Sequence, residues 1–365
     1  MSTESPYYYC GTTLLEIGRY YDDYLYAYVT IVTCCIGVIF NLINSLVFTR
    51  KTMKSPPNLI FTHLAFVDLL QLLIRLLSAS LKLTYDKNSE VRNTYAWLAF
   101  RKTYDACLAT FHFISVFLTV QLAVWRYLGV DHPVKGRNWC NMRITRNVIV
   151  AGYVMCSISL GLPTFLAPEI KPKCENSTKF YTDDDWLMHE ISAIVYGMMD
   201  RLIPSVFLAF LTYRIAVTLL ARKTGRPPSA SIRNGTRNAK TIQQINTSTT
   251  ILFIVVGLFI IAEFPKGILS LLRMIYFEKS NQNPKGCYYS LISIFHSITN
   301  FNISITFIVY YTLSQQFRNT FKSLFCKTIS ETEDDSSPLP HLGDILVLTT
   351  SEITSSARTS TYIHL

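Results

Sequence analysis

Several ionisable residues of this sequence stand inside long apolar stretches. Asp68, Arg75, His112, Arg126 and Glu263 each lie within a run of mostly apolar residues. In the middle of a lipid bilayer such a group costs about 2.5–3.5 kcal/mol on insertion scales, so it usually faces a protein interior and serves a function. The chemistry that these residue types offer is ion pairing, cation binding and recognition of charged ligands.

No group of residues in the sequence predicts an enzyme. The seven histidines are scattered along the chain and show no spacing typical of metal ligands. The sequence contains no Gly-Lys-Ser/Thr phosphate loop and no Cys-x-x-Cys pair. We therefore expect no catalytic residues.

The composition indicates a chain that lives in a membrane. Half of the 365 residues are apolar and only 16% are charged, against about 25% charged residues in a typical soluble domain. The net charge of +10 does not predict nucleic-acid binding, because the basic residues lie at the ends of apolar segments that face one side of a membrane. The expected surroundings of the chain are a lipid bilayer.

Seven segments have the length and apolar character of membrane-spanning helices, which need about 20 residues each. Lipid offers the backbone no hydrogen bonds, so each segment must be helical. We predict an all-α membrane protein with an N-terminal segment 1–23, a seven-helix bundle over 24–313, a surface helix over 314–326 and a disordered tail over 327–365. The seven helices are expected at 24–49, 58–81, 103–128, 146–168, 189–221, 245–277 and 287–313.

The loops predict how the chain crosses the membrane. The side that carries the loops after the first, third and fifth helices and the start of the tail holds 17 basic residues against one acid, Asp131. Because cytoplasmic loops are rich in Lys and Arg, the N-terminus is expected outside and the C-terminus in the cytoplasm of a plasma-membrane protein. Asn176, in Asn176-Ser177-Thr178, then lies outside as a candidate glycosylation site.

The region after the seventh helix has two parts. The stretch 314–326 places Phe317, Phe321, Leu324 and Phe325 on one face, which is typical of a helix that lies on a membrane surface. Cys326 at its end is either a palmitoylation site or an unmodified thiol. The tail contains 14 Ser or Thr and an acidic run, with too little apolar surface to form a core.

Short motifs in the predicted helices follow one order and spacing. They span residues 24–326 and resemble those of the rhodopsin-like G-protein-coupled receptors. The matching residues are Asn44-Ser45-Leu46-Val47, Leu64-Ala65-Phe66-Val67-Asp68, Arg126-Tyr127, Pro204, Phe259 with Pro265, and Tyr310 seven residues before Phe317.

Departures from the family pattern narrow the resemblance. Trp125 replaces the acid before Arg126, Glu263 replaces the Trp of the sixth helix, and Arg101 stands where the family has a Cys in the third helix. Glu263-Phe264-Pro265-Lys266-Gly267 is similar to the invertebrate, largely nematode, myosuppressin and FMRFamide-like peptide receptors. The resemblance implies a receptor for a short amidated neuropeptide. An orphan chemosensory receptor for a small molecule is the alternative; a transporter or channel fits less well, because we see no inverted repeats and no continuous polar path.

For Asp68 the resemblance implies a regulatory sodium ion, held together with Ser115 and Asn302. Oxygen ligands suit such a hard cation. The other interpretation is that Asp68 is only hydrogen-bonded to Asn44 and Asn302. We expect no further cofactor.

For signalling, the resemblance implies that Arg126, Tyr127 and Tyr310 couple the receptor to a heterotrimeric G protein. No acid occurs between Arg201 and Ala262, so with Trp125 in place Arg126 is expected to rest on hydroxyl or carbonyl partners. A kinase and an arrestin are the expected partners of the tail, because phosphorylation adds charge that a basic partner can bind.

For the ligand, we expect contacts with Arg75, Asp105, His112 and Glu263. An Arg in the ligand cannot lose its charge and needs a carboxylate in a dry cavity, which favours Asp105 and then Glu263. The alternative for Glu263 is a pair with Lys266, three residues further along the helix.

Four cysteines remain for the outer side, namely Cys10, Cys107, Cys174 and Cys287. Four cysteines allow three pairings, and the sequence alone does not choose among them. The resemblance implies a bond between Cys107 and Cys174, which ties the third helix to the second outer loop.

Overall fold

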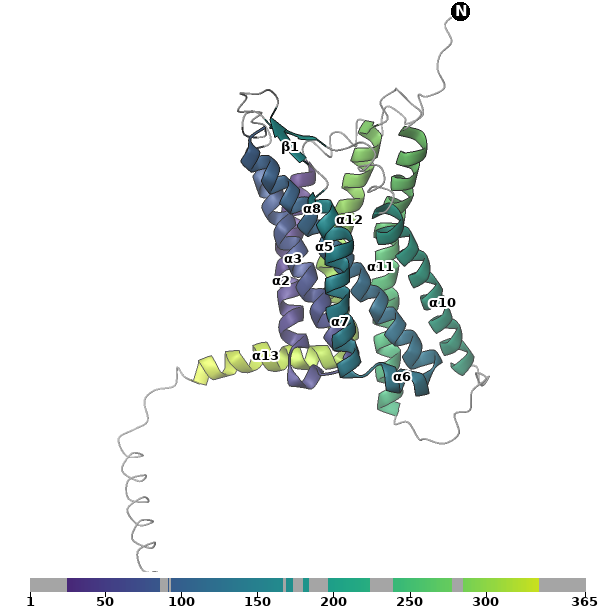
Figure 1. Ribbon diagram of the computed structural model, residues 1–365. Helices are drawn as coiled ribbons and strands as arrows, with labels where there is room; N and C mark the ends of the chain where they lie inside the picture. The colour runs from purple at the N-terminus through teal and green to yellow at the C-terminus, as the bar shows by residue number, and fades with distance from the viewer. Residues whose placement is uncertain are drawn as a thin grey trace, which may run out of the picture. The chain divides into compact units, whose positions relative to one another are not determined.

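The structure, a computed structural model, describes residues 25–85, 91, 93–166, 169–172, 180–183, 196–223, 239–277 and 285–334. Within these residues seven helical segments are long and apolar enough to cross a membrane, which confirms the predicted fold class (Figure 1). In chain order they are α2 (Tyr26–Phe48), α3 (Pro56–Tyr85), α5 (Tyr95–Asp131), α7 (Met142–Cys156) with the π-helical turn η3 (Ser157–Gly161) and α8 (Leu162–Leu166), the π-helical turn η4 (Tyr196–Leu202) with α10 (Ile203–Lys223), α11 (Ala239–Phe277) and α12 (Lys285–Leu313).

Two helices begin earlier than their apolar runs predict, because polar residues cap them. The side chain of Thr94 accepts a hydrogen bond from the backbone N–H of Trp97, so α5 begins at Tyr95 and not at residue 103. In the same way Asn141 accepts a hydrogen bond from the N–H of Ile144, and α7 begins four residues before the predicted start. N-terminal caps of this kind satisfy backbone donors that the helix itself leaves free.

Short elements connect the spanning helices. The 3-10 turn η2 (Lys51–Met53) follows α2, and α6 (Pro133–Trp139) follows α5. The strands β1 (Glu169–Pro172) and β2 (Phe180–Asp183) form an antiparallel hairpin with Glu169 opposite Asp183. This hairpin lies in a stretch for which the sequence predicted only a loop. Cys174 and Asn176 lie outside the described residues.

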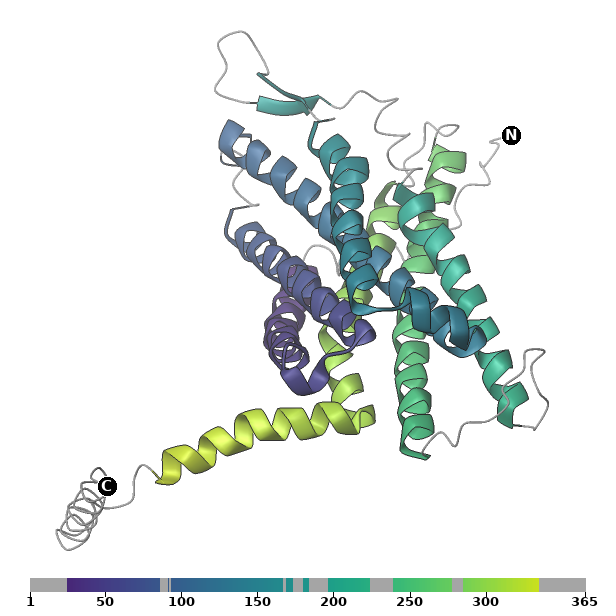
Figure 2. The ribbon, with the colours of Figure 1, turned by 60° about the horizontal axis from the view of Figure 1, so that its bottom comes forward.

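The helix α2 packs against both α3 and α12 (Figures 1 and 2). The side chain of Asn41 in α2 donates to the backbone oxygen of Ile303 in α12 at 3.2 Å, and Ser304 of α12 donates to the backbone oxygen of Thr33 at 2.9 Å. These bonds are possible because the facing residue of α2 is Gly37, which brings the two backbones close together.

Apolar side chains cover the outside of the bundle while many polar ones lie within it. Val32, Ile39 and Ile261 are about 60% exposed, whereas Asp68, Glu263 and Lys266 are each less than 5% exposed. A soluble protein shows the opposite distribution. The outward apolar surface therefore fits lipid, which the bundle requires as its solvent.

An aromatic cluster joins α2, α3 and α12 at the end of the bundle where α12 finishes. The Tyr310 ring lies 5.0 Å from Phe48, 5.0 Å from Phe61 and 5.9 Å from Phe317, measured between ring centroids. Phe317 is fully buried. The seven-residue spacing from Tyr310 to Phe317 thus corresponds to a direct ring contact.

The helix α13 (Gln315–Asp334) continues beyond residue 326, where the surface helix was predicted to end. A second compact unit begins within it, at Asn319. In that unit the rings of Phe321 and Phe325 pack at 4.7 Å, and the membrane-surface position of this helix stays a prediction. The side chain of Cys326 and the tail from residue 335 onward lie outside the described residues.

Replacing Gly37 by Ala is expected to destabilise the helix bundle. A Cβ at this position would lie 2.7 Å from Leu72 Cδ1 and closer still to Ser304 Oγ, and overpacking of this kind costs about 1–3 kcal/mol. The control is Gly257→Ala in α11, where a Cβ meets nothing within 4 Å. Thermal unfolding of the detergent-purified protein should show a lower melting temperature for Gly37→Ala alone. Equal melting temperatures would show that the contact between α2 and α12 tolerates the extra methyl group.

Candidate functional site

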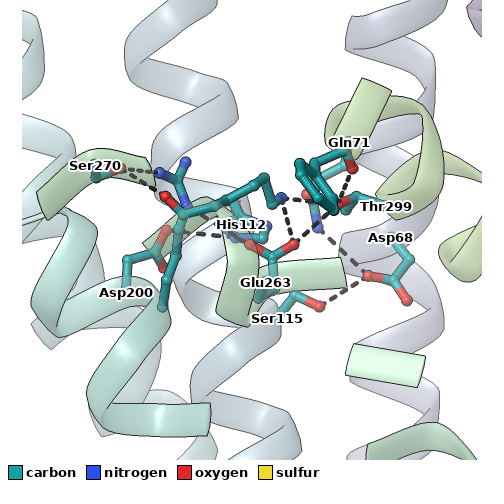
Figure 3. A network of polar contacts seen from close by, with 11 residues as sticks. Asp68, Gln71, His112, Ser115, Asp200, Glu263, Ser270 and Thr299 are labelled. Carbon is teal, nitrogen blue, oxygen red and sulfur yellow. Dashed lines mark hydrogen bonds and ion pairs between the residues drawn. The ribbon is translucent and has the colours of Figure 1, made fainter. Parts of the chain in front are cut away.

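A buried cluster of charged residues lies in the middle of the bundle, centred on Glu263 (Figure 3). Glu263 and Lys266 of α11 are each 1% exposed. The Lys266 Nζ donates to Glu263 Oε1 at 2.5 Å, and Arg201 Nε lies 3.6 Å from Glu263 Oε2. The pairing of Glu263 with Lys266 confirms one of the two interpretations drawn from the sequence.

The cluster connects the helices around it. His112 of α5 places its Nε2 3.4 Å from Asp200 in η4 and 3.4 Å from Glu263 in α11. Thr299 of α12 donates to Glu263 Oε1 at 3.0 Å and accepts from Lys266 at 2.7 Å. Figure 3 shows His112, Asp200 and Glu263 pointing toward one another. Four segments far apart in the sequence therefore meet at one carboxylate.

The π-helical turn η4 brings Asp200 and Arg201 into this cluster. A π turn inserts an extra residue into a helix and is frequent at functional sites. Gly197 allows η4 to approach α11 closely, because a Cβ there would lie 2.7 Å from Ser270 Cβ. Arg201 then donates to Ser270 Oγ at 3.2 Å. Sequence reasoning did not assign a role to Asp200 or Arg201, although both are charged residues within an apolar run, the signal that identified Glu263.

Asp68 forms a second polar centre, in α3. Its Oδ1 accepts hydrogen bonds from Ser115 at 2.9 Å and from Gln71 at 3.4 Å, and the residue is 4% exposed. The predicted neighbour Asn302 is half-buried and makes no hydrogen bond with Asp68 within the described part of the chain. Asn44 bonds to Thr306 instead. Asp68 is thus a buried carboxylate bonded to neutral groups.

The structure places Asp105 differently from the sequence prediction. Asp105 is on an exposed face of α5, 55% exposed, with Arg101 at 3.9 Å on the preceding turn. It does not join the buried cluster around Glu263, and its contact with a ligand Arg stays a prediction. Arg75, in contrast, is 5% exposed in α3, in agreement with an interior position.

The predicted bond between Cys107 and Cys174 is wrong for this structure, because Cys107 is a free thiol. The family position for this cysteine is residue 101, six residues earlier. At 1.5 Å rise per residue, Cys107 lies about 9 Å further along the helix than that position.

Arg126 of α5 is half-buried, and its Nε is enclosed without a hydrogen-bond partner. Among the described residues it makes no ion pair, which agrees with the missing acid, but the predicted hydroxyl or carbonyl partners are also not formed. Trp125 is tied to α7 by a hydrogen bond from its Nε1 to Thr145 Oγ1 at 2.9 Å. Arg126 therefore lacks the carboxylate that would hold it.

A different acid links α5 to α10 near the same end of the bundle. Asp131 accepts from Thr218 at 2.7 Å and from Arg214 at 3.2 Å, and Tyr127 also hydrogen-bonds to it. The sequence offered a signal for this role, since Asp131 is the lone acid among the 17 basic residues of its side. Sequence reasoning used it only for orientation.

Comparison with known proteins identifies the family. The family described as serpentine type 7TM GPCR chemoreceptor Srw matches residues 28–328, which is more than half of the chain. The chain belongs to this family of G-protein-coupled receptors.

Related receptors from two animals show where this receptor lies within the class. It is 26% identical to the sex peptide receptor of Drosophila melanogaster, with 86% of this chain and 75% of the relative covered. It is 26% identical to the G-protein coupled receptor dmsr-1 of Caenorhabditis elegans, over 82% and 68%. The FMRFamide peptide receptor frpr-18 of the same nematode is 23% identical, over 84% and 71%. These relatives agree with the resemblance drawn from Glu263-Phe264-Pro265-Lys266-Gly267.

Removing one partner of the Glu263–Lys266 pair is expected to destabilise the receptor strongly. A buried charge left without its partner costs about 3–5 kcal/mol, so Lys266→Met and Glu263→Gln should each lower the melting temperature. The double variant should lose less than the sum of the two, because the pair acts as a unit.

The control for this double-mutant cycle is Asp105→Asn, which breaks the exposed pair with Arg101 and should change stability little. The measurement is thermal unfolding of the purified receptor. A loss for Lys266→Met as small as that for Asp105→Asn would show that the buried pair does not stabilise the bundle.

Proposed function

We propose that this receptor binds a short amidated peptide outside the cell and activates a heterotrimeric G protein inside. The observation that carries the mechanism is the buried cluster, because it joins α5, η4, α11 and α12 through Glu263. The peptide class is supported by the relatives named for sex peptide and FMRFamide.

In this proposal the cluster is the element that the ligand shifts. The contacts from His112 and Arg201 to Glu263 hold α11 against α5 and η4. A ligand can shift a two-state equilibrium only by binding one state better than the other. Contacts that loosen the His112 or Arg201 side of the cluster would release α11, and with it the G-protein-binding end of the bundle.

The proposed orientation follows the basic loops, with the β1–β2 hairpin outside and α6 facing the cytoplasm of the cell. Arg126, Tyr127 and Tyr310 then lie toward the G protein, and the tail is the substrate of a kinase and the binding site of an arrestin. The 17 basic residues against one acid support this placement.

A screen of amidated neuropeptides tests the peptide proposal. Cells expressing the full-length receptor at the surface would be exposed to a library that includes Phe-Met-Arg-Phe-amide, with calcium and cyclic-AMP readouts. Activation by at least one peptide, absent in cells without the receptor, is the expected result. A well-expressed receptor that ignores the whole library would contradict the proposal.

A small-molecule chemoreceptor is the second candidate function, favoured by the description of the family as chemoreceptors. It predicts responses to low-molecular-weight compounds in the same cells and none to peptides. The two candidates thus give opposite results in one assay.

High basal activity is expected because Arg126 makes no ion pair among the described residues. Trp125→Asp would supply the carboxylate that the family usually places beside this Arg. If the new pair stabilises the inactive form by about 1.4 kcal/mol, basal signalling falls about tenfold. The control is Trp125→Asn, which also removes the hydrogen bond to Thr145 but adds no charge. Basal cyclic-AMP or calcium signals, compared at equal surface expression, should be lower in Trp125→Asp than in Trp125→Asn; the reverse order would exclude the missing lock as the cause.

A sodium ion is proposed at Asp68, with Ser115 as a second oxygen ligand. The fit rests on Asp68 being a buried carboxylate that, among the described residues, has no ion-pair partner, since such a charge needs a cation or a proton. Sodium at ten times its dissociation constant would stabilise the receptor by about 1.4 kcal/mol. The melting temperature should rise in sodium chloride relative to choline chloride for the wild type and for Asp105→Asn, but not for Asp68→Asn. A wild type indifferent to sodium would favour a protonated Asp68.

A further inference from the structure

Among the polar atoms of the described residues that are enclosed without a hydrogen bond, five belong to four side chains of α3 and α12. These atoms are Gln71 Oε1, Arg75 Nε, His296 Nδ1 and both Nδ2 and Oδ1 of Asn300. Gln71 and Asn300 are fully buried, and Arg75 is 5% exposed. Buried polar groups in native proteins are nearly always bonded, so a group of unbonded ones calls for a specific explanation.

Two helices bring these side chains to one level of the bundle. Gln71 and Arg75 are four residues apart on α3, and His296 and Asn300 are four residues apart on α12, so each pair lies on one helix face. The two helices meet where the Phe61 and Tyr310 rings lie 5.0 Å apart, and again where Leu72 and Ile303 share an apolar cluster.

The two helices run antiparallel, so the same helix faces that make these contacts also hold the unbonded atoms one turn further on. Arg75 lies one turn after Leu72 on α3, and Asn300 lies one turn before Ile303 on α12. By this register the unbonded atoms lie at one level of the bundle, on α3 and α12.

The unbonded atoms include both donors and acceptors. Gln71 donates through Nε2 to Asp68, which leaves its Oε1 as an acceptor. Arg75 has no acceptor atoms and offers only N–H groups. Asn300 offers one of each kind, since neither end of its amide is bonded. The region thus presents two oxygen acceptors and N–H donors from two residues.

A primary carboxamide is the group that satisfies this set. It has two N–H donors and a carbonyl oxygen with two lone pairs. We propose that the C-terminal amide of a peptide ligand binds here. Asn300 forms two hydrogen bonds with it, Arg75 donates to its carbonyl oxygen, and Gln71 accepts from its NH₂ group. This assignment rests on the proposed function, because it names the ligand group that the interior recognises.

A carboxylate fits the same atoms less well. It would neutralise Arg75, but it has no hydrogen to offer to the oxygen atoms of Gln71 and Asn300. Those two oxygens would then face a negative charge without a bond, which is costly in a dry interior. A site built around hydrogen bonds to one group rejects an analogue that lacks it by large factors.

The first test compares amide and acid forms of one peptide on the full-length receptor in cells. The probes are Phe-Met-Arg-Phe-amide and its free acid or, where the screen gives a stronger amidated agonist, that peptide and its free acid. The wild type should prefer the amide by roughly 100-fold or more in half-maximal concentration. Asn300→Leu should reduce the preference to about tenfold or less, whereas Asn302→Leu, a half-buried neighbour without these contacts, should retain it.

The second test needs no agonist and separates this proposal from the peptide proposal. Phenylalaninamide and phenylalanine at equal millimolar concentration are added to the purified full-length receptor, and the melting temperature is recorded. The amide should stabilise the wild type and not Asn300→Leu. The Asn300→Leu receptor itself should melt at or above the wild-type temperature, because the substitution removes unbonded polar atoms. If Asn300 only stabilised the fold, the variant would instead have a lower melting temperature than the wild type.

The outcomes are distinct. Silence of every amidated peptide with a clear effect of phenylalaninamide would overturn the peptide function and leave the carboxamide site standing. Activation by amide and free acid at equal concentration, with equal effects of the two phenylalanine probes, would overturn the site and leave the peptide function standing. A receptor stabilised more by phenylalanine than by its amide would identify Arg75 as a carboxylate partner and refute the proposal, as would no response to any of these probes.

Discussion

The burial of Glu263 is the constraint on which the arrangement of this receptor depends. A carboxylate in a dry interior must have partners, since an isolated charge there is far too costly. Lys266 provides one partner from the same helix, and the remaining ones come from α5, η4 and α12. A single carboxylate therefore fixes how four segments of the bundle face one another.

The same requirement explains local features that look unrelated. The π-helical turn η4 turns Asp200 and Arg201 inward, and Gly197 lets that turn approach α11. His112 places its Nε2 3.4 Å from a carboxylate oxygen of Asp200 and 3.4 Å from one of Glu263. Each of these features supplies or positions a partner for a buried charge. The π-helical turn η4 is therefore found where charged side chains must turn into the bundle.

Much of this could be predicted from the sequence, for physical reasons. Apolar runs longer than a bilayer is thick leave little choice but seven helices, and the spacing from Tyr310 to Phe317 corresponds to a ring contact. The partner of Glu263 on its own helix was also predictable, because residues three apart share a helix face. Contacts along one helix follow from sequence spacing alone.

Contacts between helices did not follow in the same way. The sequence did not show that Asp105 is 55% exposed beside Arg101, because the rotation of α5 about its own axis depends on what packs against it. Cys107 failed as a disulfide partner because a helix fixes depth at 1.5 Å per residue and leaves no freedom to adjust. Arg201 and Asp200 were missed because the sequence does not reveal a π turn, which changes the face that each residue presents.

The buried contacts of Glu263 restrain the receptor in its core and not at the end that carries Arg126. In the usual family pattern an acid beside the Arg of the third helix provides a restraint at the G-protein end, where water screens it. Here Arg126 has no such acid among the described residues, while Glu263 is paired deep in the bundle. Coulombic attraction at a given distance is several times stronger in a protein interior than in water. A restraint in the core is therefore tighter per contact than one at the end of the bundle. The end that binds the G protein is then left free to respond as soon as the core contact opens.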